Sequence, residues 1–185
     1  VDRSRWVMCS AMDWQLIDRT DSPKFYPEVF IRSLVEKKMQ DIKPPYVLCF
    51  HSTARAAKRW SNQNWVVLGQ ELASRGYQVV LPWGNAAERI ISEQIAQQVP
   101  GALVPPAFSI EDAFSMIAYA ALTIGVDTGL THMAAVLGKP TVEIYCDSPR
   151  WKTEGYWAKN ICNVGDIGAP PSVSEVIHAS LSLLN

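Results

Sequence analysis

The chain has 185 residues, a length that suits one α/β domain with a substantial core and is short for two. Hydrophobic residues make up 48% of it and charged residues 19%, which excludes a disordered chain. The formal net charge of −1 argues against nucleic acid or an anionic membrane surface as the main partner. No apolar run approaches the roughly 20 residues that span a bilayer.

The N-terminal part is expected to form two helices. Apolar side chains recur at helical spacing in 1–15 and in 28–40, and the polar segment 18–27 between them carries two prolines. The four cysteines are widely scattered and form no CxxC pair, so we expect reduced thiols of a cytoplasmic protein and no disulfide framework. The three histidines match no metal pattern, and we expect no metal site.

From residue 46 onward, short apolar runs alternate with helical patterns. This alternation, with short joints, predicts an α/β fold with a Rossmann-like, doubly wound parallel sheet. The segment 147–160 is irregular and rich in aromatic residues. The predicted strands are 46–50, 78–81, 102–104, 122–126 and 141–145, and the predicted helices are 64–75, 86–98, 109–120, 128–137 and 172–184.

Ligands of such sheets bind beyond the carboxyl ends of the strands, and the junction after 122–126 has the features of a binding site. Asp127 and Thr128 are both good N-cap residues, and Gly129 lets a ligand approach the backbone. The helix start therefore offers N–H groups and a positive dipole end to a phosphate. Asp127 would repel an anion and suits sugar hydroxyls, whereas His132 could donate to phosphate oxygens. The same residues also fit a capped helix start without a ligand.

The loop after 46–50 adds hydroxyls and positive charge to the same edge of the sheet, the rim formed by the carboxyl ends of the strands. Ser52 and Thr53 can donate to a phosphate, and Lys58 supplies a compact positive charge. The alternative for each is a polar loop with a solvated lysine. Arg55 and Arg59 are expected to face solvent.

Three further residues lie on the same rim, and for two of them the sequence leaves two interpretations open. Glu88 near a helix start either supports that helix or binds the paired hydroxyls of a ribose. Phe108 either stacks on a base or packs beneath its loop. Trp83 is expected to be structural. GxGxxG, GxxxxGK[ST] and nucleophile-elbow motifs are missing from the sequence, so the rim favours metal-independent transfer from a nucleotide sugar, without a cofactor.

Three of these segments, HSTARAAKRW (51–60), LPWG (81–84) and VDTGLTH (126–132), resemble the C-terminal half of the lipopolysaccharide heptosyltransferase I family. The resemblance implies a GT-B fold and transfer of heptose from ADP-heptose to the Kdo of lipid A–Kdo, in the inner core of lipopolysaccharide. It covers residue 46 to the end, and the opening residues resemble the hinge between the two domains. We therefore expect hinge or linker helices over 1–43, a donor-binding domain over 44–185, and an absent N-terminal acceptor domain.

The resemblance also implies a role for each rim residue. Ala54 stands where the family usually has a second Thr, which removes one phosphate donor, and Phe108 stands where a Met is common. By matching positions, Thr53, Lys58, Thr128, Gly129 and His132 would bind the diphosphate, Glu88 the ribose, Phe108 the adenine and Asp127 the heptose hydroxyls.

In the whole enzyme, the resemblance places the general base and the acceptor site in the N-terminal domain, so this chain alone is expected to be inactive. Lys58 and the helix dipole would stabilise the departing ADP. Such an enzyme would work at the cytoplasmic face of the inner membrane, with peripheral contact. The alternatives are heptosyltransferase II or another nucleotide-sugar glycosyltransferase, a non-catalytic nucleotide-sugar binding module, and a structural α/β partner domain.

Overall fold

The structure is a computed structural model that describes residues 41–155 and 158–185, and the helices expected within 1–40 lie outside these ranges. The described strands form one sheet in the order β2-β1-β3-β4-β5, and every neighbouring pair is parallel. The strands are β1 (Tyr46–Phe50), β2 (Gln78–Val80), β3 (Leu122–Val126), β4 (Thr141–Tyr145) and β5 (Ile161–Gly165).

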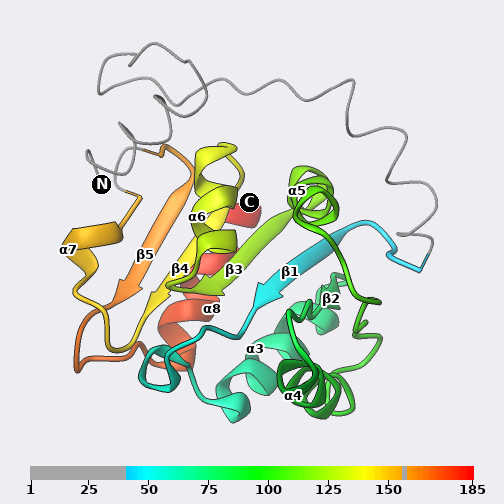
Figure 1. The fold of residues 1–185 in the computed structure, drawn as a ribbon. Coiled ribbons are helices and arrows are strands. Elements are labelled where there is room, and N and C mark those ends of the chain that lie inside the picture. The colour runs from blue at the N-terminus through cyan, green and yellow to red at the C-terminus, as the bar shows by residue number, and fades with distance from the viewer. Residues whose placement is uncertain (1–40, 156–157) are drawn as a thin grey trace.

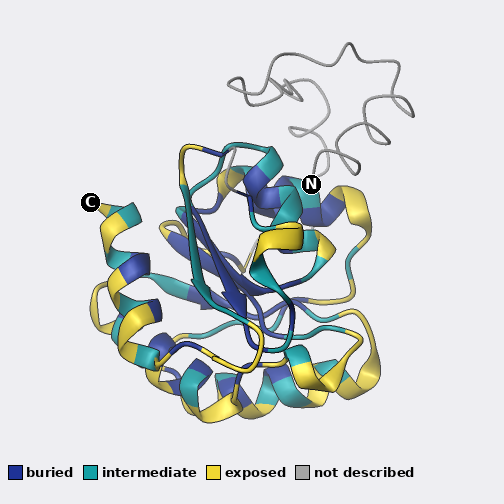
Figure 2. Ribbon diagram, turned by 90° about the vertical axis from the view of Figure 1, so that its left-hand side faces the viewer, coloured by how far each residue is buried: buried dark blue, intermediate teal, exposed yellow. Residues whose placement is uncertain are grey.

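Helices cover both faces of the sheet, as a doubly wound fold requires (Figure 1). Side chains of β1 alternate between the two layers. Val47 and Cys49 pack on the side of α3 and α8, whereas Leu48 and Phe50 pack on the side of α5 and α6. Figure 2 shows the strands buried between helices whose outer faces are exposed. The helices are α3 (Asn62–Ser74), α4 (Ala86–Ala96), α5 (Ile110–Tyr119), α6 (Gly129–Val136), α7 (Arg150–Thr153) and α8 (Val173–Leu184).

Local caps determine where two of the outer helices begin. The Ser109 hydroxyl accepts from the Asp112 amide and the Asp112 carboxylate accepts from the Ser109 amide, which makes a capping box at the start of α5. Ser172 and Glu175 make the same reciprocal pair at the start of α8. The predicted helix starts at these two positions are confirmed to within a residue.

Two sequence predictions are wrong. The segment 102–104 is not a strand, because only Leu103 makes a bridge, to Val80. Gly101, with φ of 69°, turns the chain just before it, and two prolines without amide hydrogens follow, so no ladder can extend. The segment 147–160 is not wholly irregular, since it holds α7. The strand β5 was not predicted at all, because its half-buried, part-polar sequence ICNVG gives a weak signal at the sheet edge.

The direction of the strand order reverses between β1 and β3. The chain leaves β1 toward β2 on one side and later returns to β3 on the other side, with Phe50 beside Gly125 in the register. A doubly wound sheet binds its ligands at this topological switch point. The loops that follow β1 and β3 border it, and they carry most of the predicted site residues.

Candidate functional site

An ion pair joins the two loops at the switch point. Lys58 ends a short 3-10 helix (Ala56–Lys58) after β1, and its Nζ lies 2.6 Å from Oδ2 of Asp127, directly after β3. The Asp127 side chain is 5% exposed and that of Lys58 is 19% exposed. On the other carboxylate oxygen, Oδ1, Asp127 accepts from His132 Nε2 at 2.9 Å and from Thr153 Oγ1 at 3.4 Å. Lys58 is therefore not the solvated lysine of the alternative interpretation.

The ionised forms of Asp127 and His132 stabilise each other, and Lys58 stabilises that of Asp127 as well. Burial by itself raises the pKa of Asp127, but the hydrogen bonds from His132 and Lys58 outweigh it and hold that pKa well below its usual range. Burial by itself lowers the pKa of His132, but its hydrogen bond to Asp127 and the nearby carboxylate of Glu143 raise the pKa to about 9. At neutral pH, Asp127 is thus ionised and His132 carries a proton on each ring nitrogen.

Glu143 is the site residue that sequence reasoning missed. It lies in the middle of β4, fully buried, with Oε1 2.6 Å from Nδ1 of His132. The Tyr145 hydroxyl donates to its Oε2 at 2.9 Å. A charged residue inside the otherwise apolar run TVEIY was the available signal, because a buried carboxylate needs a positive partner. The structure thus gives His132 two carboxylate neighbours in place of a ring N–H that faces the rim.

The start of α6 presents open backbone. Thr128 occupies the N-cap with extended dihedrals, φ −146° and ψ 156°, but its side chain makes no capping hydrogen bond. A Cβ added to Gly129 would meet nothing within 4 Å, so the approach to this first turn is open. Behind it, a Cβ on Gly125 would overlap the Thr131 hydroxyl, which shows how closely α6 packs on β3. The predicted helix start is confirmed, while its side-chain cap is absent.

The loop after β1 is held by its own polar contacts. His51 is buried, with Nε2 2.7 Å from the Ser92 hydroxyl of α4 and Nδ1 2.9 Å from the Ser52 hydroxyl. Burial lowers the pKa of His51 to about 4, so the ring is neutral. The Thr53 side chain is half-buried, and its carbonyl accepts from the Arg59 guanidinium at 3.3 Å. Hydrogen bonds of His51 before Thr53 and of Arg59 after it therefore hold the loop in place.

The predicted solvent-facing arginine Arg55 lies on the same rim. Its side chain is 67% exposed, and its guanidinium lies 3.5 Å from the carboxylate of Asp147, after β4. Such an exposed pair contributes little to stability. The pair matters for its position, because Asp147 follows β4 and the end of a third strand thereby joins the rim.

Glu88 supports its helix, as one of the two interpretations predicts. Its Oε2 accepts from the Gly84 amide at 2.8 Å, and its own amide donates to the Asn85 side chain at 3.0 Å, which caps α4. Glu88 is half-buried at the first turn of that helix. A ribose contact stays a prediction beside this structural role.

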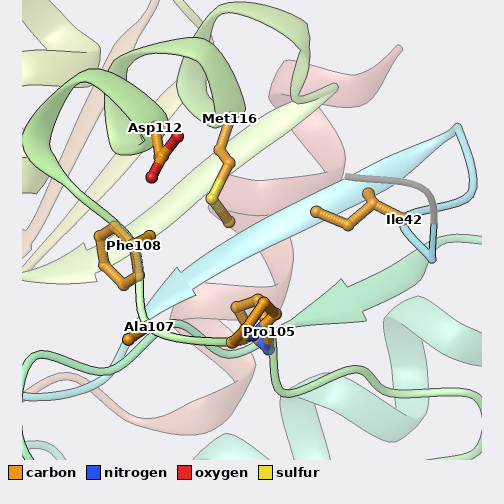
Figure 3. Close-up of a pocket in the computed structure, with 7 residues that line it drawn as sticks. Ile42, Pro105, Ala107, Phe108, Asp112 and Met116 are labelled. Carbon is orange, nitrogen blue, oxygen red and sulfur yellow. The ribbon is translucent and has the colours of Figure 1, made fainter. Parts of the chain in front are cut away.

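Phe108 lies at the edge of a small pocket over β1, next to the start of α5 (Figure 3). The neighbouring loop is fixed by Trp83, whose indole N–H donates to the Pro105 carbonyl at 2.8 Å, which confirms the structural role predicted for Trp83. The pocket is mostly apolar, with one carboxylate in its wall. Its lining residues are Ile42, Pro105, Pro106, Ala107, Phe108, Asp112 and Met116.

Within 41–155 and 158–185, no group of three or more His, Cys, Asp or Glu side chains is arranged to hold a metal ion. Over the same ranges, every helix is too short or too polar to cross a membrane.

Comparison with known proteins agrees with the fold. The heptosyltransferase 1 of Pseudomonas aeruginosa (strain PAO1) is 31% identical over 177 residues, which cover 95% of this chain and 47% of that protein. The structure of E. coli heptosyltransferase WaaC with ADP matches with a TM-score of 0.72 at 21% identity, covering 98% of this chain and 56% of that one. The structure of WaaC with ADP-2-deoxy-2-fluoro heptose matches with a TM-score of 0.66 at 23% identity, covering 98% and 53%.

These matches bear on the fold and on the extent of the chain. The chain spans about half the length of the relatives it matches. The sequence pattern described as glycosyltransferase family 9 (heptosyltransferase) matches residues 9–180, nearly the whole chain. The chain therefore belongs to glycosyltransferase family 9, the heptosyltransferases.

Proposed function

We propose that this chain is the donor-binding half of a heptosyltransferase of type I. Its donor is ADP-heptose, and the reaction transfers the heptose to the Kdo of a lipid A–Kdo acceptor in the inner core of lipopolysaccharide. The acceptor site and the general base belong to the half of the relatives' length that this chain does not span. The enzyme works at the cytoplasmic face of the inner membrane.

The observation that carries the proposal is the pairing of Lys58 with an open helix start at the switch point. Lys58 comes from the loop after β1, and Gly129 opens α6 after β3. A lysine ammonium has three N–H donors, and Asp127 takes one of them. The remaining donors, together with the backbone amides at the positive end of α6, suit a diphosphate.

The adenine and the heptose of the donor also have candidate binding residues in this chain. Phe108, half-buried at the edge of the small apolar pocket, offers an aromatic face on which an adenine ring would stack. The Asp127 carboxylate has roughly four lone-pair positions. Lys58, His132 and Thr153 donate to this carboxylate, and Ser148 also interacts with it. A heptose hydroxyl would therefore bind there by replacing a weak donor such as Thr153, which lies at 3.4 Å.

The chemistry assigned to this half is stabilisation of the leaving group. The acceptor oxygen forms a bond to the anomeric carbon of heptose while the bond from that carbon to the phosphate oxygen breaks. Negative charge then develops on the departing ADP, and Lys58 with the dipole of α6 stabilises it. The acceptor proton goes to the base of the other half. This assignment uses no cofactor.

Calorimetric titration of the 185-residue chain with ADP, ADP-heptose, UDP and GDP tests the proposal. We expect ADP and ADP-heptose to bind at least about tenfold more tightly than UDP and GDP, because the pocket at Phe108 takes the base. Circular dichroism of the same sample establishes that the chain is folded.

The titration separates the competing functions. A preference for UDP or GDP would replace ADP-heptose with another nucleotide sugar. The absence of binding to all four nucleotides by a folded chain would overturn the proposal in favour of a structural domain. For the catalytic part, fusing the N-terminal half of the Pseudomonas aeruginosa relative to this chain should give heptose transfer, and a fusion that binds ADP-heptose without transfer would favour a binding module.

A further inference from the structure

Glu143 is a buried carboxylate to which the proposed reaction assigns no role. It is 0% exposed and lies between Val142 and Ile144, two residues of the main core. Its Oε2 accepts from the Tyr145 hydroxyl at 2.9 Å and from the Gly155 amide at 3.3 Å. These neutral donors do not balance its charge, and an unbalanced buried charge is costly.

The balancing charge comes from His132. Oε1 of Glu143 lies 2.6 Å from Nδ1 of the ring, at ion-pair distance without the alignment of a good hydrogen bond. The opposite nitrogen, Nε2, is bonded to Asp127 at 2.9 Å. A neutral imidazole has only one N–H, so a ring between two carboxylates is satisfied only as the imidazolium. Two carboxylates then face two cations, His132 and Lys58.

The chain after α7 is shaped to reach this carboxylate. A Cβ on Gly155 would approach Cδ1 of Ile161 to 2.5 Å, so a larger residue here would make that side chain shift, whereas the Gly155 amide reaches Oε2 of Glu143 at 3.3 Å. Thr153, two residues earlier, contacts Asp127. The segment that follows β4 thus contacts both carboxylates that flank His132, Asp127 through Thr153 and Glu143 through Gly155.

We propose that Glu143 is a positioning residue of the donor site, which holds His132 against Asp127 as an imidazolium. The charge of Asp127 is then shared between His132 and Lys58. With a neutral His132, Lys58 would be the sole cation on Asp127 and would be drawn more tightly to it. With a charged His132, the Lys58 ammonium is freer to bind an anionic phosphate. This last step rests on the proposed function, whereas the charge of His132 does not.

The titratable groups around His132 come from three segments. Asp127 follows β3, Glu143 and Tyr145 belong to β4, and Lys58 reaches the cluster through Asp127. Helix α5, which packs on α6, carries its carboxylates in its own first turn, where Asp112 accepts from the Ser109 amide. Asp127 and Glu143 are the carboxylates that contact the ring.

The direct test is the titration of the His132 ring by NMR in the ligand-free chain. Glu143→Gln removes the charge and keeps an acceptor for Tyr145 and Gly155. We expect its His132 pKa to fall by about 1 to 3 pH units, the effect of losing an adjacent opposite charge. Tyr145→Phe is the matched control, because it removes a neutral donor and leaves both carboxylates, so its His132 should titrate close to the wild type. An unshifted ring in Glu143→Gln overturns the proposal.

The functional readout is the pH dependence of ADP affinity measured by calorimetry. The wild type should hold its affinity from pH 6 to about 8, while Glu143→Gln should lose about three- to tenfold over the same range as its ring deprotonates. An affinity in Glu143→Gln that follows the wild type would overturn the link to donor binding. If the wild type binds no ADP at any pH, the proposed function fails, and a shifted ring still supports the action of Glu143 on His132. Should Glu143→Gln not fold, Glu143→Asp, which keeps the charge at shorter reach, should show a smaller shift in the same direction.

Discussion

The ammonium of Lys58 and the carboxylate of Asp127 meet at 2.6 Å across the point where the strand order of the sheet reverses. The two residues are 69 positions apart in the chain. Their contact ties the loop after β1 to the start of α6 and sets the distance between the two phosphate-binding elements that we propose.

Lys58→Ala should weaken ADP binding by about 10- to 100-fold, because it removes a charged donor to the diphosphate. It should also lower the free energy of unfolding by about 1 to 3 kcal/mol, since Asp127 loses one partner while it stays buried. Calorimetry and urea denaturation measure the two effects. The control is Lys159→Ala, an exposed lysine before β5 at the opposite edge of the sheet. Equal ADP affinity in Lys58→Ala and in the wild type would argue against a phosphate role.

The stability of the chain should decrease as the pH rises from about 6.5 to about 9. The folded state binds the His132 proton more tightly than the unfolded state, so this stabilisation is complete below the ordinary pKa and is lost as the pH passes the raised one. The pKa difference corresponds to at most about 3 kcal/mol. Urea denaturation across this range measures the slope. His132→Gln should flatten it, whereas His178→Gln, an exposed histidine on α8, should leave it intact.

Gly129→Val should separate binding from folding. A side chain at this position meets nothing within 4 Å in the structure, so the melting temperature should change by no more than a few degrees. The same side chain would occupy the open approach to the first turn of α6 and should reduce ADP affinity by about tenfold or more. Thermal denaturation and calorimetry on one preparation test both parts. Unchanged affinity would show that the ligand does not approach this turn.

Phe108→Ala should weaken ADP binding by about 5- to 150-fold, because stacking of a base on an aromatic ring contributes about 1 to 3 kcal/mol. Phe108→Met should retain most of the affinity, since an apolar wall of similar size remains in the pocket. The control is Ile90→Ala, which removes an exposed apolar side chain from α4. If Phe108→Ala binds ADP as well as the control does, the adenine lies elsewhere.

Local patterns in the sequence were sufficient for most of the fold. The strand 141–145 was predicted with the bounds that the structure shows, because a short apolar run between turn residues leaves little choice. The helix start at Ser109 follows from a serine with an acidic residue three positions on. The failures at 102–104 and at β5 have the opposite cause, since pairing with a neighbouring strand, and not local apolar content, decided those segments.

The sequence by itself also placed the candidate site, because the carboxyl ends of parallel strands share one edge of the sheet. Lys58 and Gly129 could be assigned to that edge from their positions after two predicted strands. Only the tertiary structure decided which side chains meet there. It paired Lys58 with Asp127 and put the buried Glu143 behind His132. Such contacts depend on strand order, register and the close packing of α6 on β3, which arise between segments far apart in the chain and leave no local pattern to recognise.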